Sequence, residues 1–126
     1  MFGDIHHIAI ICSDYEVSKD FYINKLGFRV IQETYREERK SYKLDLRQGN
    51  IQIELFTFPQ SPKRLSYPEA TGLRHLAFSV SDIEKTKQEL ENKGITMEDI
   101  RIDEITGKKY TFFADPDGLP LELYEI

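Results

Sequence analysis

Apolar residues alternate or cluster in short segments along the first half of the chain, and these segments predict its secondary structure. Residues 6–12 form a short Ile-rich run that is typical of a strand. Residues 14–25 follow a helical period, and the apolar members of one face can pack on a sheet. This face consists of Tyr15, Ser18, Phe21, Tyr22 and Lys25. Three further strands are predicted at 28–35, 42–47 and 51–58.

The second half repeats this order of elements. A strand is predicted at 75–80, and a helix begins after the capping-box pattern Ser81-x-x-Glu84, as the first helix does after Ser13-x-x-Glu16. Gly27 and Gly94 suit the ends of the two helices. The remaining strands of the second half are expected at about 97–103, 109–114 and 119–125.

The two halves are also similar residue by residue. When the sequence is shifted by 68 positions, residues 7–25 fall on 75–93, and eight of these 19 positions are identical. The same shift places IQIELF (51–56) on LPLELY (119–124), so that Glu54 falls on Glu122. We interpret the halves as two copies of one supersecondary unit.

The repeat predicts an α+β fold made of two tandem βαβββ modules, one at about 5–58 and the other at about 73–126. Residues 59–72 contain three prolines and are expected to link the copies. A module of roughly 55 residues buries little surface alone, so we expect a single domain, 1–126, in which the copies share a core.

Strand alternation then separates two kinds of face. One face is uniformly aliphatic and suits packing under the helices. The other carries His7, Glu54, His75 and Glu122, one His and one Glu from each copy. His6 is expected on the opposite face and has no counterpart, because Arg74 occupies its place, so we expect it to be structural or to support the site indirectly.

A carboxylate inside an apolar strand costs several kcal/mol when it is buried without a partner. Two imidazoles and two carboxylates can share one divalent cation, and their nitrogen and oxygen ligands suit Ni, Co, Zn, Mn or Fe. The sequence therefore predicts a metal site formed by His7, Glu54, His75 and Glu122, with two octahedral positions left for water or substrate.

Composition and charge restrict the remaining possibilities. The chain has 126 residues, of which 40% are hydrophobic and 31% charged, and its net charge is −5. The negative charge argues against nucleic-acid binding, and no apolar run is long enough for a membrane helix. The sequence has one cysteine and no signal-peptide pattern at its start, so a cytoplasmic protein without a disulfide framework is expected.

Several motifs resemble the vicinal oxygen chelate superfamily, which includes glyoxalase I, bleomycin-resistance proteins and ring-cleaving dioxygenases. They are HHIAI (6–10), FYINKLGF (21–28), IELF (53–56), GLRHLAFSV (72–80) and DPDGLPLELYE (115–125). Within the superfamily the chain resembles small bacterial glyoxalase-like proteins of the YaeR type. The resemblance implies a curled mixed sheet around a metal-binding cavity, the same four ligands as the repeat, and a homodimer in which the site forms within one chain or across a swapped pair.

The departures from glyoxalase I concern its substrate. Glyoxalase I typically has an arginine and an asparagine that help to hold glutathione, four residues after the first and the second ligand, where this chain has Ile11 and Phe58. The glutathione adduct of methylglyoxal is therefore not the expected substrate. A binding module like the bleomycin-resistance proteins, which lack the four ligands, is one alternative; an epimerase, a thiol transferase or a dioxygenase is another.

The resemblance implies a lyase or isomerase that moves a proton next to a carbonyl of a small oxygen-rich substrate. Glu122 matches the usual base, and Glu54 could return the proton. The segment 34–43 could supply cations for a substrate carboxylate or phosphate, although a solvated hairpin is the alternative. Together with aromatic residues on the glutamate faces, the candidate substrate contacts are Arg36, Arg39, Lys43, Phe56, Phe58 and Tyr124.

Overall fold

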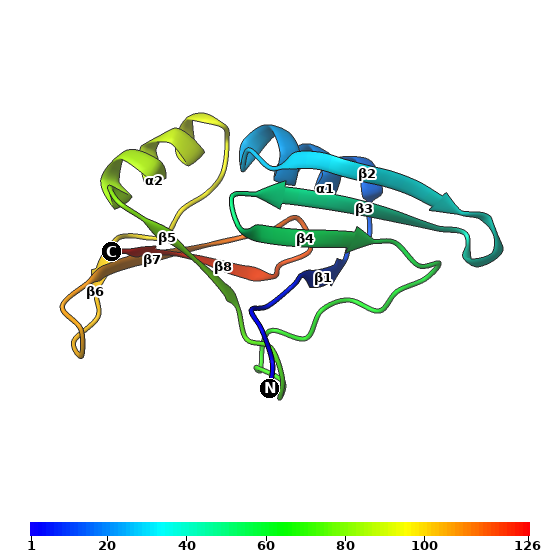
Figure 1. The fold of residues 1–126 in the computed structure, drawn as a ribbon. Helices are drawn as coiled ribbons and strands as arrows, with labels where there is room; N and C mark the ends of the chain where they lie inside the picture. Colours follow the sequence, from blue (N-terminus) through cyan, green and yellow to red (C-terminus); the bar gives the residue numbers. More distant parts are fainter. The chain divides into compact units, whose positions relative to one another are not determined.

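The computed structural model describes residues 1–126 and divides the chain into two units, Met1–Lys63 and Arg64–Ile126. In the first unit (Figure 1) the elements are β1 (Ile8–Ile11), α1 (Tyr15–Asp20), a π-helical segment (Phe21–Lys25), β2 (Arg29–Arg36), a 3₁₀ turn (Glu37–Arg39), β3 (Ser41–Gln48) and β4 (Ile51–Phe56). Its strands form one mixed sheet in the order β1-β4-β3-β2, in which β1 and β4 are parallel.

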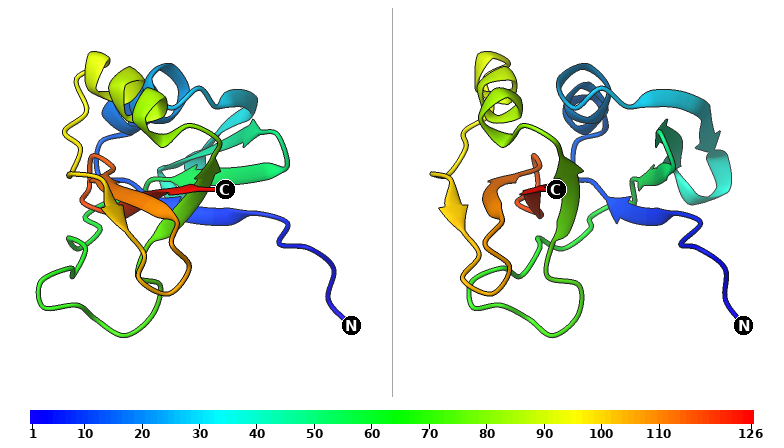
Figure 2. Two further views of the ribbon diagram at one scale, coloured as in Figure 1. Left: turned by 90° about the vertical axis from the view of Figure 1, so that its left-hand side faces the viewer. Right: turned by 60° about the vertical axis from the view of Figure 1, so that its left-hand side comes forward.

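The second unit has the same topology. Its elements are β5 (Leu76–Val80), α2 (Ile83–Asn92), β6 (Arg101–Ile102), β7 (Lys109–Ala114) and β8 (Pro120–Glu125). The sheet order is β5-β8-β7-β6, and β5 and β8 are the parallel pair. Figure 2 shows α2 lying along one side of this sheet. The predicted α+β fold with two βαβββ modules is therefore confirmed.

One face of each sheet is buried, as the strand alternation predicts. The fully buried strand residues of the first unit include Leu44, Leu46, Ile53 and Leu55, and in the second unit Leu121 and Leu123 are almost completely buried. The alternate residues of the same strands, among them Glu54 and Glu122, therefore belong to the opposite face, which we call the open face of each sheet.

An aromatic contact fixes α1 against its sheet. The ring of Tyr15 stacks on that of Tyr42 in β3, with 4.1 Å between centroids. Its hydroxyl donates to the carboxylate of Glu33 in β2, which also accepts from Lys19 at 2.7 Å. Burial raises the pKa of Tyr15 well above its ordinary value, and the bonds from Lys19 and Tyr15 lower that of Glu33.

Several predicted boundaries are wrong in detail. The helix expected at 14–25 changes to π geometry after Asp20, with a bond from the Leu26 N–H to the Phe21 carbonyl. The strand expected at 97–103 is reduced to β6, since the preceding residues join β7 only through isolated bonds such as Glu98 N–H to the Phe112 carbonyl. The first strand begins at Ile8 rather than at residue 6.

The helix caps also lie one residue later than the capping-box pattern suggests. Asp14 caps α1 by accepting from the Val17 N–H at 3.2 Å, and Asp82 caps α2 by accepting from the Lys85 N–H at 3.0 Å. Both residues have extended backbone angles, as an N-cap requires. Their negatively charged carboxylates also interact favourably with the positive N-terminal end of the helix dipole.

None of the helices has the length and apolar character needed to cross a bilayer.

The single shared core and the curled sheet around a metal cavity stay predictions, because each unit forms a sheet of its own.

The cap assignment predicts a difference between two neighbouring substitutions in the second unit. Asp82→Ala removes the acceptor for the Lys85 N–H and should lower the free energy of unfolding by about 1 kcal/mol. Ser81→Ala is the control and should change it by less than about 0.5 kcal/mol. Urea denaturation followed by far-ultraviolet circular dichroism measures both, and a larger loss for Ser81→Ala would contradict the assignment.

Candidate functional site

A His–Glu pair lies on the open face of the second sheet. His75 directly precedes β5, and its Nε2 is 2.9 Å from Oε2 of Glu122 on the neighbouring parallel strand β8. Glu122 is only 8% exposed. Its neighbour across the strand pair is Ala77, which has a small side chain. The His75 ring packs edge-on against Phe112 at 5.1 Å, which fixes its orientation.

Arg74 determines which nitrogen of His75 carries the proton. Nη1 of Arg74 is 3.2 Å from Nδ1 of His75, and arginine has no acceptor atom. Nδ1 therefore accepts, and the proton of the neutral ring is on Nε2, where it is donated to Glu122. The buried carboxylate thus has a hydrogen-bond donor.

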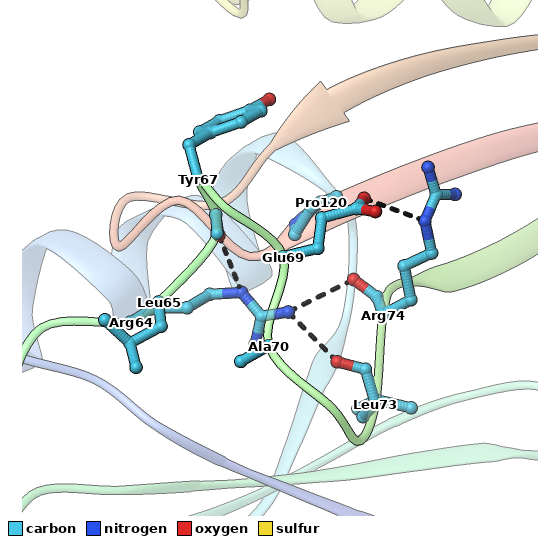
Figure 3. A pocket seen from close by; sticks show the side chains of 9 residues that line it. Arg64, Leu65, Tyr67, Glu69, Ala70, Leu73, Arg74 and Pro120 are labelled. Carbon is cyan, nitrogen blue, oxygen red and sulfur yellow. Dashed lines mark hydrogen bonds and ion pairs between the residues drawn. The ribbon is translucent and has the colours of Figure 1, made fainter.

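The loop before β5 holds Arg74 in place (Figure 3). Arg64 donates to the carbonyls of Leu73 and Arg74 at 3.0 and 3.1 Å and so closes the loop into a ring. Glu69 accepts from Nε of Arg74 at 2.9 Å. These residues line a small pocket that also contacts Pro120, two positions before Glu122. The loop therefore connects the pocket with the His75–Glu122 pair.

The corresponding pair of the first unit has a longer contact. Nδ1 of His7 is 3.6 Å from Oε2 of Glu54, which lies in β4 and is 7% exposed. The neighbour of Glu54 on the parallel strand is Ala9, the counterpart of Ala77. The two pairs thus occupy equivalent positions in the two sheets.

Glu54 has partners that Glu122 lacks. Its Oε2 accepts from Gln52 at 3.2 Å, and its Oε1 is 3.6 Å from Nζ of Lys43. Lys43 in turn donates to Asp45 at 2.6 Å, and this bond is the main reason why the pKa of Lys43 is raised. Arg47 donates to Gln52 at 2.8 Å. A polar network therefore surrounds the first-unit carboxylate.

Strand alternation predicts that His6 and His7 point to opposite faces, but the structure brings their rings together. The two Nδ1 atoms are 2.9 Å apart and the rings meet edge-on, with 5.2 Å between centroids. The reason is that β1 begins at Ile8, so alternation does not extend to residues 6 and 7.

The donor set suits a divalent ion, although neither pair is a metal site by itself. Within either unit no group of three or more His, Cys, Asp or Glu side chains lies close enough to hold an ion. A ring nitrogen must be unprotonated to bind a metal. Binding through Nε2 of His75 would move its proton to Nδ1 and displace Arg74, whose side chain is 62% exposed. The predicted four-ligand set thus needs one pair from each unit.

The other predicted contacts fall into three groups. Arg36, Lys43, Phe56 and Phe58 form a cluster in the first unit, with the Arg36 guanidinium 4.9 Å from the Phe56 centroid. Arg39 lies exposed in the 3₁₀ turn, outside this cluster. In the second unit the Tyr124 hydroxyl donates to Asp103 at 3.0 Å and bonds Thr106.

Sequence reasoning missed Gln52, Asp45 and the bonding role of Arg74. The two-residue period of Lys43, Asp45 and Arg47 in β3 carried a usable signal, because alternation places all three on the face of Glu54. No local pattern indicates the contact of Arg74 with His75 and Glu69, since it depends on how residues 64–74 fold.

Known proteins share both the sequence and the fold of this chain. The chain is 68% identical to YwkD of Bacillus subtilis (strain 168) over 122 residues, which cover 96% of this chain and 95% of YwkD. It is 58% identical over 122 residues to YaeR of Escherichia coli (strain K12), with the same coverage. Both relatives are described as uncharacterized.

A glyoxalase family protein from Enterococcus faecalis has a similar solved structure, with a TM-score of 0.94, 54% identity and 98% of each chain covered. Residues 4–123 match a model of the Glyoxalase/Bleomycin resistance protein/Dioxygenase superfamily. Because this match spans nearly the whole chain and agrees with its close relatives, the protein belongs to that superfamily.

Proposed function

We propose that the protein is a metal-dependent lyase or isomerase that moves a proton next to a carbonyl of a small oxygen-rich substrate. The observation that carries the proposal is the occurrence of one His–Glu pair at the same place in each repeat. In both, an almost fully buried glutamate lies beside an alanine on the open face. Structural needs alone do not require the same buried carboxylate twice, because burying a charge is costly.

His7, Glu54, His75 and Glu122 would hold one divalent ion, within one chain or between the chains of a homodimer. When bound, such an ion would act as a Lewis acid that stabilises negative charge on substrate oxygens. Nickel, cobalt, zinc, manganese and iron all accept two imidazoles and two carboxylates.

Glu122 is the proposed base. No protein group bonds Oε1 of Glu122, and the contact of its Oε2 with Nε2 of His75 would be released when Nε2 binds the metal. Oε1 can therefore accept the proton from the substrate carbon. Burial around Glu122, including Phe112 beside His75, limits the access of water to the transferred proton.

Glu54 is the proposed second carboxylate, which returns the proton to the neighbouring carbon. Gln52 and His7 approach its Oε2, and Lys43 approaches its Oε1. Since both oxygens already face protein donors, Glu54 has fewer free lone pairs than Glu122 and is the weaker candidate for the first proton abstraction.

Metal binding should depend on the pairs and not on carboxylates in general. The purified chain should bind about one divalent ion, and His75→Ala should lower the metal affinity by more than about 100-fold. Substitution of a residue that only hydrogen-bonds to a metal ligand typically costs about 10- to 100-fold. Elemental analysis and calorimetric titration with nickel or zinc measure these quantities.

Asp45→Asn is the matched control for the metal test. Asp45 lies directly opposite Glu54 on β3 but is neutralised by Lys43, so its loss should change the metal affinity by less than about tenfold. Absence of stoichiometric binding, or equal losses for Asp45→Asn and His75→Ala, would refute the proposed ligand set.

The proposed base is tested with Glu122→Gln and Glu54→Gln, each with the metal restored. Glutamine keeps the size and an oxygen ligand but cannot accept the proton. Deuterium incorporation from D₂O next to the carbonyl of small hydroxy- and keto-acids, followed by proton NMR, should fall about 10²–10⁴-fold in Glu122→Gln. Glu54→Gln should retain more, and equal losses would mean that both carboxylates abstract protons.

The glutathione adduct of methylglyoxal should be a poor substrate. Ile11 and Phe58 are exposed apolar side chains that cannot donate to glutathione carboxylates or amides. The value of kcat/KM, measured spectrophotometrically on the metal-loaded protein, should lie well below about 10⁴ M⁻¹s⁻¹. A value above that level would show that other residues hold glutathione.

A further inference from the structure

Arg36, at the end of β2, has an unusual environment on the open face of the first sheet. Its guanidinium carbon lies 4.9 Å from the centroid of Phe56 and 5.5 Å from that of Phe58. The two phenylalanine rings are nearly parallel, with an angle of 7° between them. The planar guanidinium therefore makes cation–π contacts with two rings that are already parallel to each other.

The charge of Arg36 is not neutralised by any carboxylate. One terminal nitrogen, Nη2, donates to the buried hydroxyl of Ser41 at 2.7 Å. Nε is buried and has no acceptor. Nη1 has no protein partner and is not among the buried unbonded atoms, so it is the donor that an external group can reach. A partly buried cation without an anion is costly unless a partner completes it.

The neighbouring cation on this face is already paired. Lys43 donates to Asp45 at 2.6 Å and lies 3.6 Å from Glu54, so both nearby carboxylates are used. Lys43 also lies 5.9 Å from the Phe56 centroid. The local charges therefore leave Arg36 as the group able to bind an additional anion.

The second unit provides a natural comparison. Arg101 in β6 lies over Tyr110 and Phe112, at 5.1 and 5.8 Å. Unlike Arg36, it forms an ion pair with Glu98 at 2.9 Å. Both repeats thus place an arginine over aromatic rings, but only Arg36 lacks a carboxylate.

We propose that Arg36, held against Phe56 and Phe58, binds the anionic group of the substrate, a carboxylate or a phosphate. The bond would form through Nη1, and a guanidinium suits both oxyanions. The exposed ring of Phe58 would contact the hydrocarbon part of the ligand. This inference rests on the proposed function only in assigning the anion to a substrate.

The position of the cluster limits the size of that substrate. Phe56 is two residues beyond Glu54 in β4, on the same face. Since a strand rises about 3.3 Å per residue, Phe56 lies about 7 Å from Glu54 along the strand. The anionic group would therefore be a few bonds away from the carbon to which Glu54 returns the proton, as in a small organic acid or a sugar phosphate.

The test uses the metal-free full chain, so that anion binding is measured separately from metal binding and catalysis. Inorganic phosphate and malonate are titrated in separate experiments, with sodium chloride keeping the ionic strength constant. NMR follows the Arg36 Nε–H and the backbone amides of Ser41 and Phe56. We expect saturable shifts with at least one anion, and the stronger of the two identifies the class of anion.

Three variants assign the binding. Arg36→Gln should weaken the affinity about ten- to a hundredfold. Arg36→Lys keeps the charge without the planar fork and should give an intermediate loss. Arg101→Gln, the matched control, should bind like the wild type. Amide spectra show whether each variant is folded. If Arg36→Gln is not folded, the affinity of Arg36→Lys decides the test.

Any of three results would overturn the inference: no saturable shift with either anion, unchanged affinity in the folded Arg36 variants, or an equal loss of affinity in Arg101→Gln. Deuterium exchange that persists alongside such a result would retain the proposed function and remove only the anionic substrate. Anion binding without metal binding would instead support a binding protein without the proposed chemistry.

Discussion

Burying a carboxylate on the open face of a sheet is the constraint on which the candidate site depends. Glu54 and Glu122 are both less than 10% exposed, and each faces an alanine on the parallel neighbour strand. A buried ion needs a partner. The residue before each parallel strand supplies it, since His7 and His75 reach across to the carboxylates. The aliphatic faces on the other side keep the strand register, because a slip by one residue would expose them.

The two copies solve this requirement differently. The residue opposite Glu54 on β3 is Asp45, whereas the residue opposite Glu122 on β7 is Phe112. The first copy therefore surrounds its glutamate with Lys43 and Gln52, while the second leaves Glu122 with His75 alone in an aromatic setting. Since the backbone topology is the same, the difference comes from side chains, and it gives the two carboxylates different bonding partners.

Much of this arrangement could be predicted from the sequence, because repetition and strand period are local signals. They identified both modules, the buried faces and the two His–Glu pairs. Features set by local competition were less predictable: Asp14 and Asp82 rather than the serines before them cap the helices, and β6 retains only two residues. The contact of Arg74 with His75 could not be predicted, since it depends on a closed loop without a regular period.

Two independent differences between the copies support the division of roles that we propose. Arg36 lies over the rings of Phe56 and Phe58 without a carboxylate, whereas Arg101 lies over aromatic rings of β7 and is paired with Glu98. Glu54 is occupied by donors, whereas Glu122 keeps one oxygen free of protein bonds. On the proposed function, the first copy would bind and orient the substrate anion, and the second would abstract the proton. A duplicated unit can diverge in this way without changing its fold, because the open face contributes little to the packing that holds each sheet against its helix.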